Sequence, residues 1–332
     1  VLPPCLRRRS VVSVCFLKKA KSNGVLPRLS FKLTSAPFKM SNLVILAAGL
    51  GSRFGGNKQL AEFGHQQLTL MEYNLLNAVA AGFTRVIFII RPELESQLKR
   101  QVIVRLPKQF SYSIAFQTLK DLPKGCSLPS QRCKPLGTAH ALWCCRHLLD
   151  DSFAVINADD FYGKQAFSLL LQQAKLTPEH YLIVAYQLKN TLSEFGGVNR
   201  GLCQLDTQHH LTHIEECEQI TTNDESITGI LSTTQTTINL SENQLISMNC
   251  WFFTPAIFSI LEQSITALLT ATTQESVDLT AECYLPNVVM AQIQQQAVVV
   301  KVLSTTDSWF GLTYSQDSEQ VAEKITALFT KK

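Results

Sequence analysis

The residues best suited to chemistry lie in a glycine-rich stretch that follows an apolar run at 43–46. Gly49 and Gly51 are followed by Arg53 and then by Lys58. Because glycine has no Cβ, backbone N–H groups beside it can approach an anion closely. An arginine binds phosphate oxygens through two parallel hydrogen bonds, and a lysine adds a point charge. The stretch therefore predicts a phosphate-binding loop at the end of a strand.

An acidic pair, Asp159 and Asp160, is the second group that could do chemistry. It follows another apolar run, at 153–156, so we expect it at the end of a buried strand. Carboxylates placed there, beside bound phosphates, are the hard oxygen ligands that Mg²⁺ shares with nucleotides. The alternative interpretation is that these side chains cap a helix that begins near Gly163. The pattern leaves both roles open.

Two other phosphate-binding motifs do not fit the glycine-rich stretch. A P-loop counted from Gly51 needs a lysine at position 57, where the chain has Asn57. A dinucleotide fingerprint counted from Gly49 needs a glycine where Phe54 stands, and the second strand ends in Arg91 instead of an acid. The sequence therefore argues against a P-loop NTPase and against a dehydrogenase.

Strands and helices alternate through the first half of the chain. Apolar runs predict strands at 43–46, 85–90, 112–116 and 153–156, and helical spacing predicts helices over 68–81 and 93–104. Units of this kind cross over right-handed and give parallel strands. We therefore predict a three-layer α/β fold, with a Rossmann-like, mostly parallel (mixed) sheet and helices on both faces. Ligands bind at the carboxyl ends of such strands, where the glycine-rich stretch lies.

The second half of the chain is expected to continue the sheet. The patterns predict strands at 181–186, 201–206, 210–216, 245–253 and 297–303, helices over 255–269, after Pro286 and at the C-terminus, and a loop over 217–237. Spacing predicts that the last helix buries Val321, Ile325, Leu328 and Phe329. We expect residues 41–332 to form a single domain with two halves, about 41–175 and about 176–332.

The composition excludes some classes of protein. Of the 332 residues, 45% are hydrophobic and 17% are charged. Residues 1–40 hold nine Lys or Arg and no acid, so the rest combines 21 basic with 26 acidic side chains. A mildly acidic folded part argues against nucleic-acid binding, and no apolar run reaches the roughly 20 residues of a membrane span. Residues 1–40 form a basic leader that is compatible with a transit peptide, although we favour translation from Met40 and a leader that is disordered or not native.

The cysteines and histidines do not suggest a metal centre. The ten cysteines include no Cys-x-x-Cys pair, which is typical of reduced thiols in a cytoplasmic protein. His209, His210 and His213 have no cysteine or carboxylate at ligand spacing. We expect them at a solvated hairpin tip.

The stretch from Leu46 to Arg53, Leu-Ala-Ala-Gly-x-Gly-Ser-Arg, together with Lys58, resembles the signature of the sugar-phosphate nucleotidyltransferases. The resemblance covers about residues 42–330. Met-Asn-x-Trp at 248–251, Glu-x-x-Leu-Pro at 282–286 and Trp-Phe-Gly at 309–311 resemble a branch of the family close to glucose-1-phosphate uridylyltransferases. It implies the nucleotide-diphospho-sugar transferase fold, with a nucleotide-binding half followed by a sugar-binding half. It also implies that Arg53, Lys58 and Asp159 are catalytic, with Mg²⁺ on Asp159.

For the nucleotide, the resemblance implies contacts from the signature and from a base-recognition segment. Gln117 directly follows a strand, and Pro135-Leu136-Gly137-Thr138 opens the next helix. A glutamine amide offers both a donor and an acceptor to a pyrimidine edge. The implied nucleotide-binding residues are Leu46, Ala47, Ala48, Gly49, Gly51, Ser52, Gln117, Pro135, Gly137, Thr138 and Asp160.

For the sugar, the resemblance implies a glycine turn, an acidic pair and an asparagine. These residues are Gly196, Gly197, Glu215, Glu216 and Asn249. Asn249 interrupts an apolar run, so its amide needs a partner. A sugar hydroxyl and a backbone group are both compatible with the sequence.

The chain departs from the family pattern at two charged positions. The lysine that follows the acidic pair in the family is replaced by Cys217, so the cation that meets the sugar's phosphate is unassigned. The unranked candidates for that cation are Arg200, Lys164 and Lys301. The second metal-binding acid corresponds to Asp307, which lies slightly early, while Gly311 occupies about the expected position.

The function that the resemblance implies is transfer of a nucleotidyl group from an NTP, with UTP favoured, to a sugar-1-phosphate. Pyrophosphate leaves in an Mg²⁺-assisted in-line attack. Two alternatives stay open: a nucleotidyltransferase for another phosphorylated acceptor, and a non-catalytic nucleotide-sugar-binding regulatory protein. The expected partners are the NTP and the sugar-1-phosphate, with neither nucleic acid nor membrane, and assembly into a homo-oligomer stays open.

Overall fold

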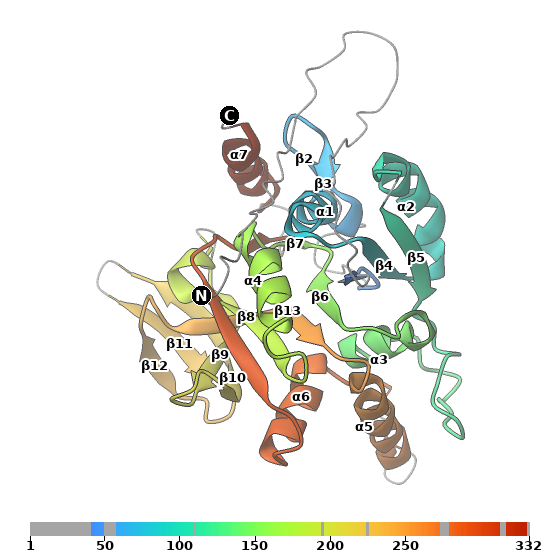
Figure 1. The fold of residues 1–332 in the computed structure, drawn as a ribbon. Helices are drawn as coiled ribbons and strands as arrows, with labels where there is room; N and C mark the ends of the chain where they lie inside the picture. The colour runs from blue at the N-terminus through green and yellow to red at the C-terminus, as the bar shows by residue number, and fades with distance from the viewer. Residues whose placement is uncertain are drawn as a thin grey trace, which may run out of the picture.

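A mixed sheet of eleven strands forms the centre of the protein, with helices on both of its faces (Figure 1). The structure is a computed structural model that describes residues 41–49, 58–108, 110–193, 196–223, 226–272, 279–312 and 317–330. Nine strands run in the order β12-β11-β10-β9-β13-β6-β1-β4-β5, while β8 pairs with β13 and β14 pairs with β8. The α/β fold predicted from the sequence is confirmed.

The parallel part of the sheet carries the signature. Strand β1 (Asn42–Leu46) lies between β4 (Arg85–Ile90) and β6 (Phe153–Asn157), and β5 (Ser111–Phe116) pairs with the outer side of β4. All of these neighbours run parallel, as the strand–helix–strand order predicted. Every residue of β1 is buried because both faces of the sheet are covered.

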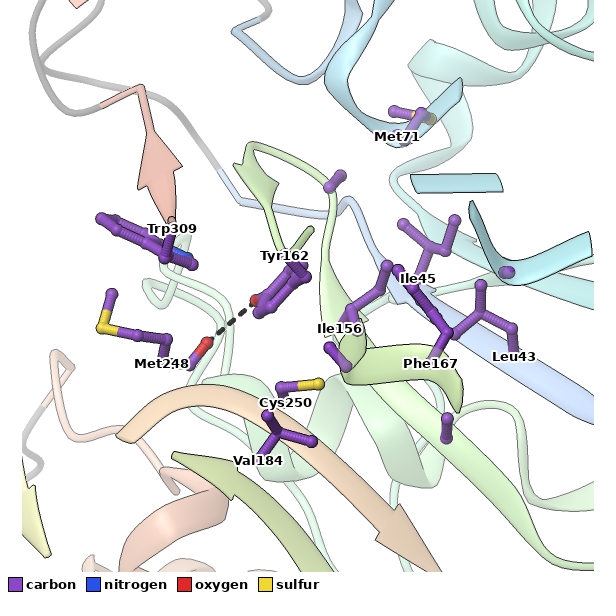
Figure 2. Packing of buried hydrophobic residues seen from close by; sticks show 14 of the residues in the cluster. Leu43, Ile45, Met71, Ile156, Tyr162, Phe167, Val184, Met248, Cys250 and Trp309 are labelled. Atoms are coloured by element: carbon purple, nitrogen blue, oxygen red, sulfur yellow. Dashed lines mark hydrogen bonds between the residues drawn. The ribbon is translucent and has the colours of Figure 1, made fainter. Parts of the chain in front are cut away.

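Two hydrophobic cores lie on the two faces of the sheet. Alternate residues of β1 enter different cores: Leu43 and Ile45 lie in one, part of which Figure 2 shows, and Val44 and Leu46 lie in the other. The first core also contains residues of α1 (Leu70–Ala81), α2 (Glu95–Gln101) and α4 (Gln165–Ala174). The second contains residues of α3 (Thr138–Trp143), α5 (Ile257–Thr272) and α6 (Leu285–Gln294). These two helical layers and the sheet make the three layers.

The other end of the sheet is antiparallel and corrects one prediction. Strands β9 (Val198–Leu205), β10 (Leu211–Thr222), β11 (Ile227–Leu231) and β12 (Thr237–Leu240) lie at the end opposite β5 (Figure 1). The predicted loop over 217–237 is therefore wrong, because it contains the end of β10 and all of β11. Buried Cys217, Ile220 and Ile227 supply an apolar face, and β-branched threonines suit the other face.

Strand β13 (Leu245–Phe253) joins the two parts of the sheet. Its first half pairs with β9 and with β8 (Tyr181–Gln187), and its second half pairs with β8 and β6. The register shifts between Ser247 and Trp251, and Asn249 within this irregularity has a φ of 61°. Asparagine tolerates this left-handed conformation better than most residues do. Strand β14 (Val300–Thr305) runs parallel to β8 at the branch.

The C-terminal segment packs beside the strand that carries Asp160. Strand β7 (Asp160–Phe161) pairs with β15 (Phe310–Gly311), and the rings of Phe161 and Phe310 stack 4.8 Å apart. Helix α7 (Asp317–Thr330) lies against these strands and against a hairpin of β2 (Glu62–Phe63) and β3 (Leu68–Thr69). Val321 and Ile325 are buried as predicted, but the prediction for Leu328 is wrong because its side chain faces solvent.

The described part of the chain contains no helix that is both long and apolar enough to cross a membrane. Its eight cysteines are all free thiols.

Candidate active site

The signature strand ends where the predicted loop begins. Leu46 closes β1, and Ala47 and Ala48 are buried directly after it. The side-chain amide of Gln59 donates a 2.9 Å hydrogen bond to the carbonyl of Gly49, so the chain after the loop is fastened to its start. The predicted residues Gly51, Ser52 and Arg53 lie outside the described residues.

Two of the predicted catalytic side chains meet. The ammonium of Lys58 forms an ion pair with the Asp159 carboxylate and donates a 3.2 Å hydrogen bond to the carbonyl of Leu312. The backbone N–H of Leu312 in turn donates to the carbonyl of Asp159 over 3.1 Å. Asp159 lies just beyond the end of β6, the strand beside β1. Each side chain keeps about a fifth of its surface exposed, 21% for Lys58 and 19% for Asp159, so both are accessible to a ligand.

Asp160 is buried in a polar network next to this pair. Its Oδ2 accepts hydrogen bonds from the amide of Asn157 at 2.9 Å and from the hydroxyl of Tyr162 at 3.1 Å. Burial and the neighbouring charge of Asp159 raise the pKa of Asp160 well above the usual range of a carboxyl group. The Tyr162 hydroxyl also lies 2.9 Å from the carbonyl of Met248 (Figure 2), and its single proton cannot serve both oxygens.

The helix-cap interpretation of the acidic pair is wrong. Helix α4 begins at Gln165, and the backbone N–H of Gln165 donates a 2.6 Å hydrogen bond to Oδ2 of Asp307. Asp307 also lies so close to Gly163 that a Cβ there would come within 2.3 Å of its carboxylate. The acid that the resemblance offered as a second metal ligand therefore caps α4.

The other expected position for a second acid is filled by Gly311. It pairs with Asp160, and a Cβ at position 311 would lie 2.4 Å from Oδ1 of Asp160, so no larger side chain fits. The described part of the chain contains no group of three or more metal-ligating side chains. Mg²⁺ commonly binds through one or two carboxylates together with substrate phosphates and water. The partly exposed carboxylate oxygens of Asp159 fit such a site.

The amide of Asn249 is held by side chains. The Nε1–H of Trp251 donates to Asn249 Oδ1, and Asn249 Nδ2 donates to Asn157 Oδ1, both over 2.7 Å. The side-chain amide of Asn157 in turn donates a hydrogen bond to Asp160. Of the two partners that the sequence left open, a backbone group is not what the amide contacts in the described part of the chain, because both of its hydrogen bonds go to side chains. The irregularity in β13 thus fixes the side chains at the end of β6.

A pocket opens beside the hydrogen bonds that link Asn249, Asn157 and Asp160, and residues from both halves of the chain line this pocket. Asn157 and Asp160 come from the first half, and Arg200, Glu216 and Asn249 come from the second. Of the predicted acidic pair, only Glu216 lines the pocket. Burial is the main reason that the pKa of Glu216 is raised. The neighbouring Glu215 instead accepts a hydrogen bond from the hydroxyl of Thr233.

Arg200 is the one of the three candidate cations that the structure places in the pocket. Its guanidinium lies 4.7 Å from the ring centre of Trp309 and donates to the backbone carbonyls of Asn199 and Thr191. Desolvation lowers the pKa of Arg200 to about 10, and no carboxylate in the described part of the chain forms an ion pair with it. Lys164 is exposed and Lys301 lies on β14.

The predicted glycine turn lies close to Arg200. Gly197 and Arg200 line a second pocket together with Trp309 and Lys324 of α7. A Cβ on Gly197 would come within 3.2 Å of the Cα of Gln219, so β10 packs tightly against this turn. Gly196 has a φ of 151°, and a Cβ there would meet no atom within 4 Å.

The base-recognition segment assembles as one unit. The side-chain Nε2 of Gln117 donates a 3.0 Å hydrogen bond to the carbonyl of Gly137 and lies 3.3 Å from Nδ1 of His140. Gly137 has a φ of 91°, and a Cβ there would come within 2.6 Å of the carbonyl oxygen of Cys283. The hydroxyl oxygen of Thr138 accepts a hydrogen bond from the backbone N–H of Leu285 in α6.

Pro135 and the histidines have other surroundings. The carbonyl of Pro135 accepts a 3.1 Å hydrogen bond from the guanidinium of Arg132. His209 and His210 lie in the turn between β9 and β10, the hairpin tip that the sequence predicted. His213 was expected there too, but it lies within β10 and pairs with β9.

Sequence reasoning missed several residues of the site. Asn157 and Tyr162 hold Asp160, and His140 contacts Gln117. The polar residue that ends the apolar run at 153–156 was a usable signal for Asn157. No pattern in the sequence distinguishes the tyrosine or the histidine from ordinary buried residues.

Solved structures share this fold. A UTP-bound UGPase from Acinetobacter baumannii is 15% identical, with a TM-score of 0.54 over 88% of this chain and 95% of that chain. A putative glucose-1-phosphate thymidylyltransferase from Bacillus anthracis is 15% identical, with a TM-score of 0.54 over 87% and 95%. The inositol-1-phosphate CTP transferase from T. maritima is 12% identical, with a TM-score of 0.50 over 86% and 94%. The fold is that of the nucleotide-diphospho-sugar transferases.

A family model described as nucleotidyl transferase matches residues 42–285. The chain belongs to this family and is a nucleotidyltransferase. No match was found among curated protein sequences.

Proposed function

We propose that the protein transfers a nucleotidyl group from an NTP, with UTP favoured, to a sugar-1-phosphate. The observation that carries this proposal is the pairing of Lys58 with Asp159 at the carboxyl ends of β1 and β6. A cation and a hard carboxylate at this edge suit a nucleotide phosphate and its metal ion. The pocket next to the pair, lined by both halves of the chain, offers room for the acceptor.

The proposed reaction requires positioning and charge neutralisation. An oxygen of the sugar-1-phosphate attacks the α-phosphorus of the NTP, and the bond to the pyrophosphate oxygen breaks. No general base is needed because the attacking phosphate is already an anion. Lys58 holds the α-phosphate, and Arg53 of the signature holds the leaving pyrophosphate. Mg²⁺ bound by Asp159 supplies further neutralisation of the phosphate charges.

On the acceptor side, we assign the sugar's phosphate to Arg200. Its guanidinium is partly buried, lines the pocket and forms no ion pair with a carboxylate in the described part of the chain. Asp160, Glu216 and Asp317 stabilise its charge without pairing with it, so a substrate anion in contact with it would compensate the charge further. This arginine takes the place of the lysine that Cys217 replaces.

Glu216 and Asn249 face the sugar hydroxyls, and Glu215 contributes less because it lies outside the pocket. Gly197 of the glycine turn shapes the adjoining second pocket, which Arg200 also lines.

An alternative acceptor is the second candidate function. It is favoured by the replacement of the family's lysine and by the structural likeness to an inositol-1-phosphate CTP transferase. A non-catalytic nucleotide-sugar-binding role is supported by Gly311, which stands where a second metal-binding acid was expected. The Lys58–Asp159 pair argues against this last alternative, because a binding protein has no need of it.

Pyrophosphate release tests these proposals. UTP, dTTP, CTP and GTP are each combined with hexose-1-phosphates, an inositol phosphate and a phosphoalcohol, with Mg²⁺ present. Release with UTP and a hexose-1-phosphate is the expected result. Release only with another acceptor supports the second candidate. Nucleotide-sugar binding without release for any pair contradicts the enzymatic proposal.

A further inference from the structure

A buried histidine contacts the glutamine of the base-recognition segment and has no part in the reaction proposed above. His140 lies in α3 and exposes 0% of its surface. We propose that His140 is a specificity-positioning residue, which holds the Gln117 amide so that its oxygen faces the base and uridine nucleotides are preferred to cytidine nucleotides. This inference rests on the proposed function, because it requires a nucleotide base against Gln117.

The surroundings of His140 determine which ring nitrogen carries the proton. Its Nε2 lies 2.7 Å from the backbone carbonyl oxygen of Asp121, which can only accept. The Nε2 atom must therefore be the donor. Burial holds the pKa of His140 below its usual range, so the imidazole is neutral near pH 7 and Nδ1 is a bare acceptor.

The position of Nδ1 then determines the orientation of the Gln117 amide. The amide nitrogen lies 3.3 Å from Nδ1 of His140 and 3.0 Å from the carbonyl oxygen of Gly137. Both partners accept, and an amide nitrogen carries two N–H donors. A reversed amide would place its oxygen against two acceptors and lose both hydrogen bonds. In the described part of the chain, no group donates to Gln117 Oε1, so this oxygen is available to a ligand.

An available oxygen discriminates between the two pyrimidines. Uracil presents an N3–H donor, which the Gln117 oxygen accepts. Cytosine in the same pose presents a lone pair at N3, which repels the oxygen. Without His140, only the Gly137 carbonyl still holds the amide, so reversal costs one hydrogen bond instead of two. The reversed amide presents its N–H groups, which suit cytosine. Since one hydrogen bond to an uncharged group is worth about 1 kcal/mol, the preference should change by about tenfold when the amide turns.

The carbonyl that sets the His140 proton is itself held in place. The carboxylate of Asp121 forms a two-pronged ion pair with Arg146, at 2.9 and 3.0 Å. The guanidinium of Arg146 lies 3.4 Å from the ring centre of Trp143, and the Trp143 ring stacks on His140. Asp121 belongs to the loop after β5, and Arg146 links it to Trp143 of α3. This loop therefore cannot move away from His140 without breaking the ion pair. The fold thus fixes the tautomer.

Calorimetric binding of UTP and CTP to matched variants tests the proposal. His140→Gln keeps an amide donor near Asp121 but loses the acceptor at Nδ1, so the UTP preference should fall about tenfold. His140→Asn places an oxygen near the Nδ1 position and should retain most of the preference. The control is the neighbouring Cys145→Ala, whose thiol donates a hydrogen bond to the carbonyl of Leu142 and not to the His140 ring, and it should leave the preference unchanged.

Two further measurements test whether His140 acts through Gln117 and which nitrogen of its ring carries the proton. In a Gln117→Ala background, His140→Gln should have no effect on the preference, because the histidine acts through the glutamine. Nitrogen-15 NMR of the wild-type imidazole should show a protonated Nε2, and it requires no variant to fold. A protonated Nδ1, or an unchanged preference in folded His140→Gln, would overturn the inference alone. Failure of the wild type to bind either nucleotide removes the proposed function and this inference with it.

Discussion

The nucleotide side and the acceptor side of the pocket are built differently. On the nucleotide side, Lys58 and Asp159 come from segments that follow adjacent parallel strands. Asp159 lies just past the end of β6, and Lys58 reaches it from the segment that follows the signature. On the acceptor side, Arg200, Glu216 and Asn249 come from antiparallel strands with shifted registers. A local motif therefore specifies the first group, whereas the pairing of distant strands specifies the second. The two departures from the family pattern, Cys217 and Gly311, lie at an acceptor position and at a metal position.

The largest expected effect tests the nucleotide side. Asp159→Asn removes the charge that faces Lys58 and the proposed metal oxygen. Turnover should fall by about 10²–10³, the usual effect of losing one preorganised group of this kind. The measurement is pyrophosphate release at saturating substrates. The exposed acid Asp150, changed to Asn, is the control and should retain full activity. Equal activity of both variants would place the chemistry elsewhere.

The next effect tests the acceptor side. Arg200→Gln should raise the KM for the sugar-1-phosphate by about 10- to 100-fold, because a hydrogen bond to a charged group is worth about 1.5–3 kcal/mol. The KM for the NTP should stay the same. Steady-state kinetics with each substrate varied in turn measure both constants. Lys301→Met is the control for loss of a cation, and a larger effect there would reassign the phosphate.

A third prediction concerns Gly311, which stands where a second metal-binding acid was expected. Gly311→Ala adds a Cβ against Asp160 and should lower the free energy of unfolding by about 1–3 kcal/mol, through overpacking. Denaturant unfolding with an unchanged m-value measures this loss. Unaltered stability would mean that β7 and β15 are not paired as described.

The smallest expected effect distinguishes the roles of the neighbouring residues Glu215 and Glu216. Glu216→Gln should raise the KM for the sugar-1-phosphate by about 2- to 10-fold, since one hydrogen bond to a hydroxyl is weakened. Glu215→Gln changes the same charge one residue away, outside the pocket, and should leave that KM unaltered. The reverse order of the two variants would contradict the register of β10.

The parallel strands could be predicted because their signals are continuous. An apolar run such as 85–90 marks a strand by itself, and the structure places β4 at those bounds. β11 could not be recognised, because its burial depends on pairing with β10 across an irregular register. The cap that Asp307 provides for α4 was equally hidden, since 142 positions separate it from Gln165.

The candidate site shows the same limit. The positions of Lys58 and Gln117 relative to strands were readable, so their regions were predicted. The choice of Arg200 among three cations was not, because it depends on which strand borders the pocket. The partners of Asn249 were hidden for a similar reason, since they lie across β13 and β6.

A crystal structure with UTP and Mg²⁺ tests the central claim most directly. We expect Lys58 to exchange its contact with Asp159 for a phosphate oxygen, and Asp159 to bind the metal ion beside the same phosphates. A nucleotide bound away from the ends of β1 and β6, with Lys58 and Asp159 still paired to each other, would contradict it.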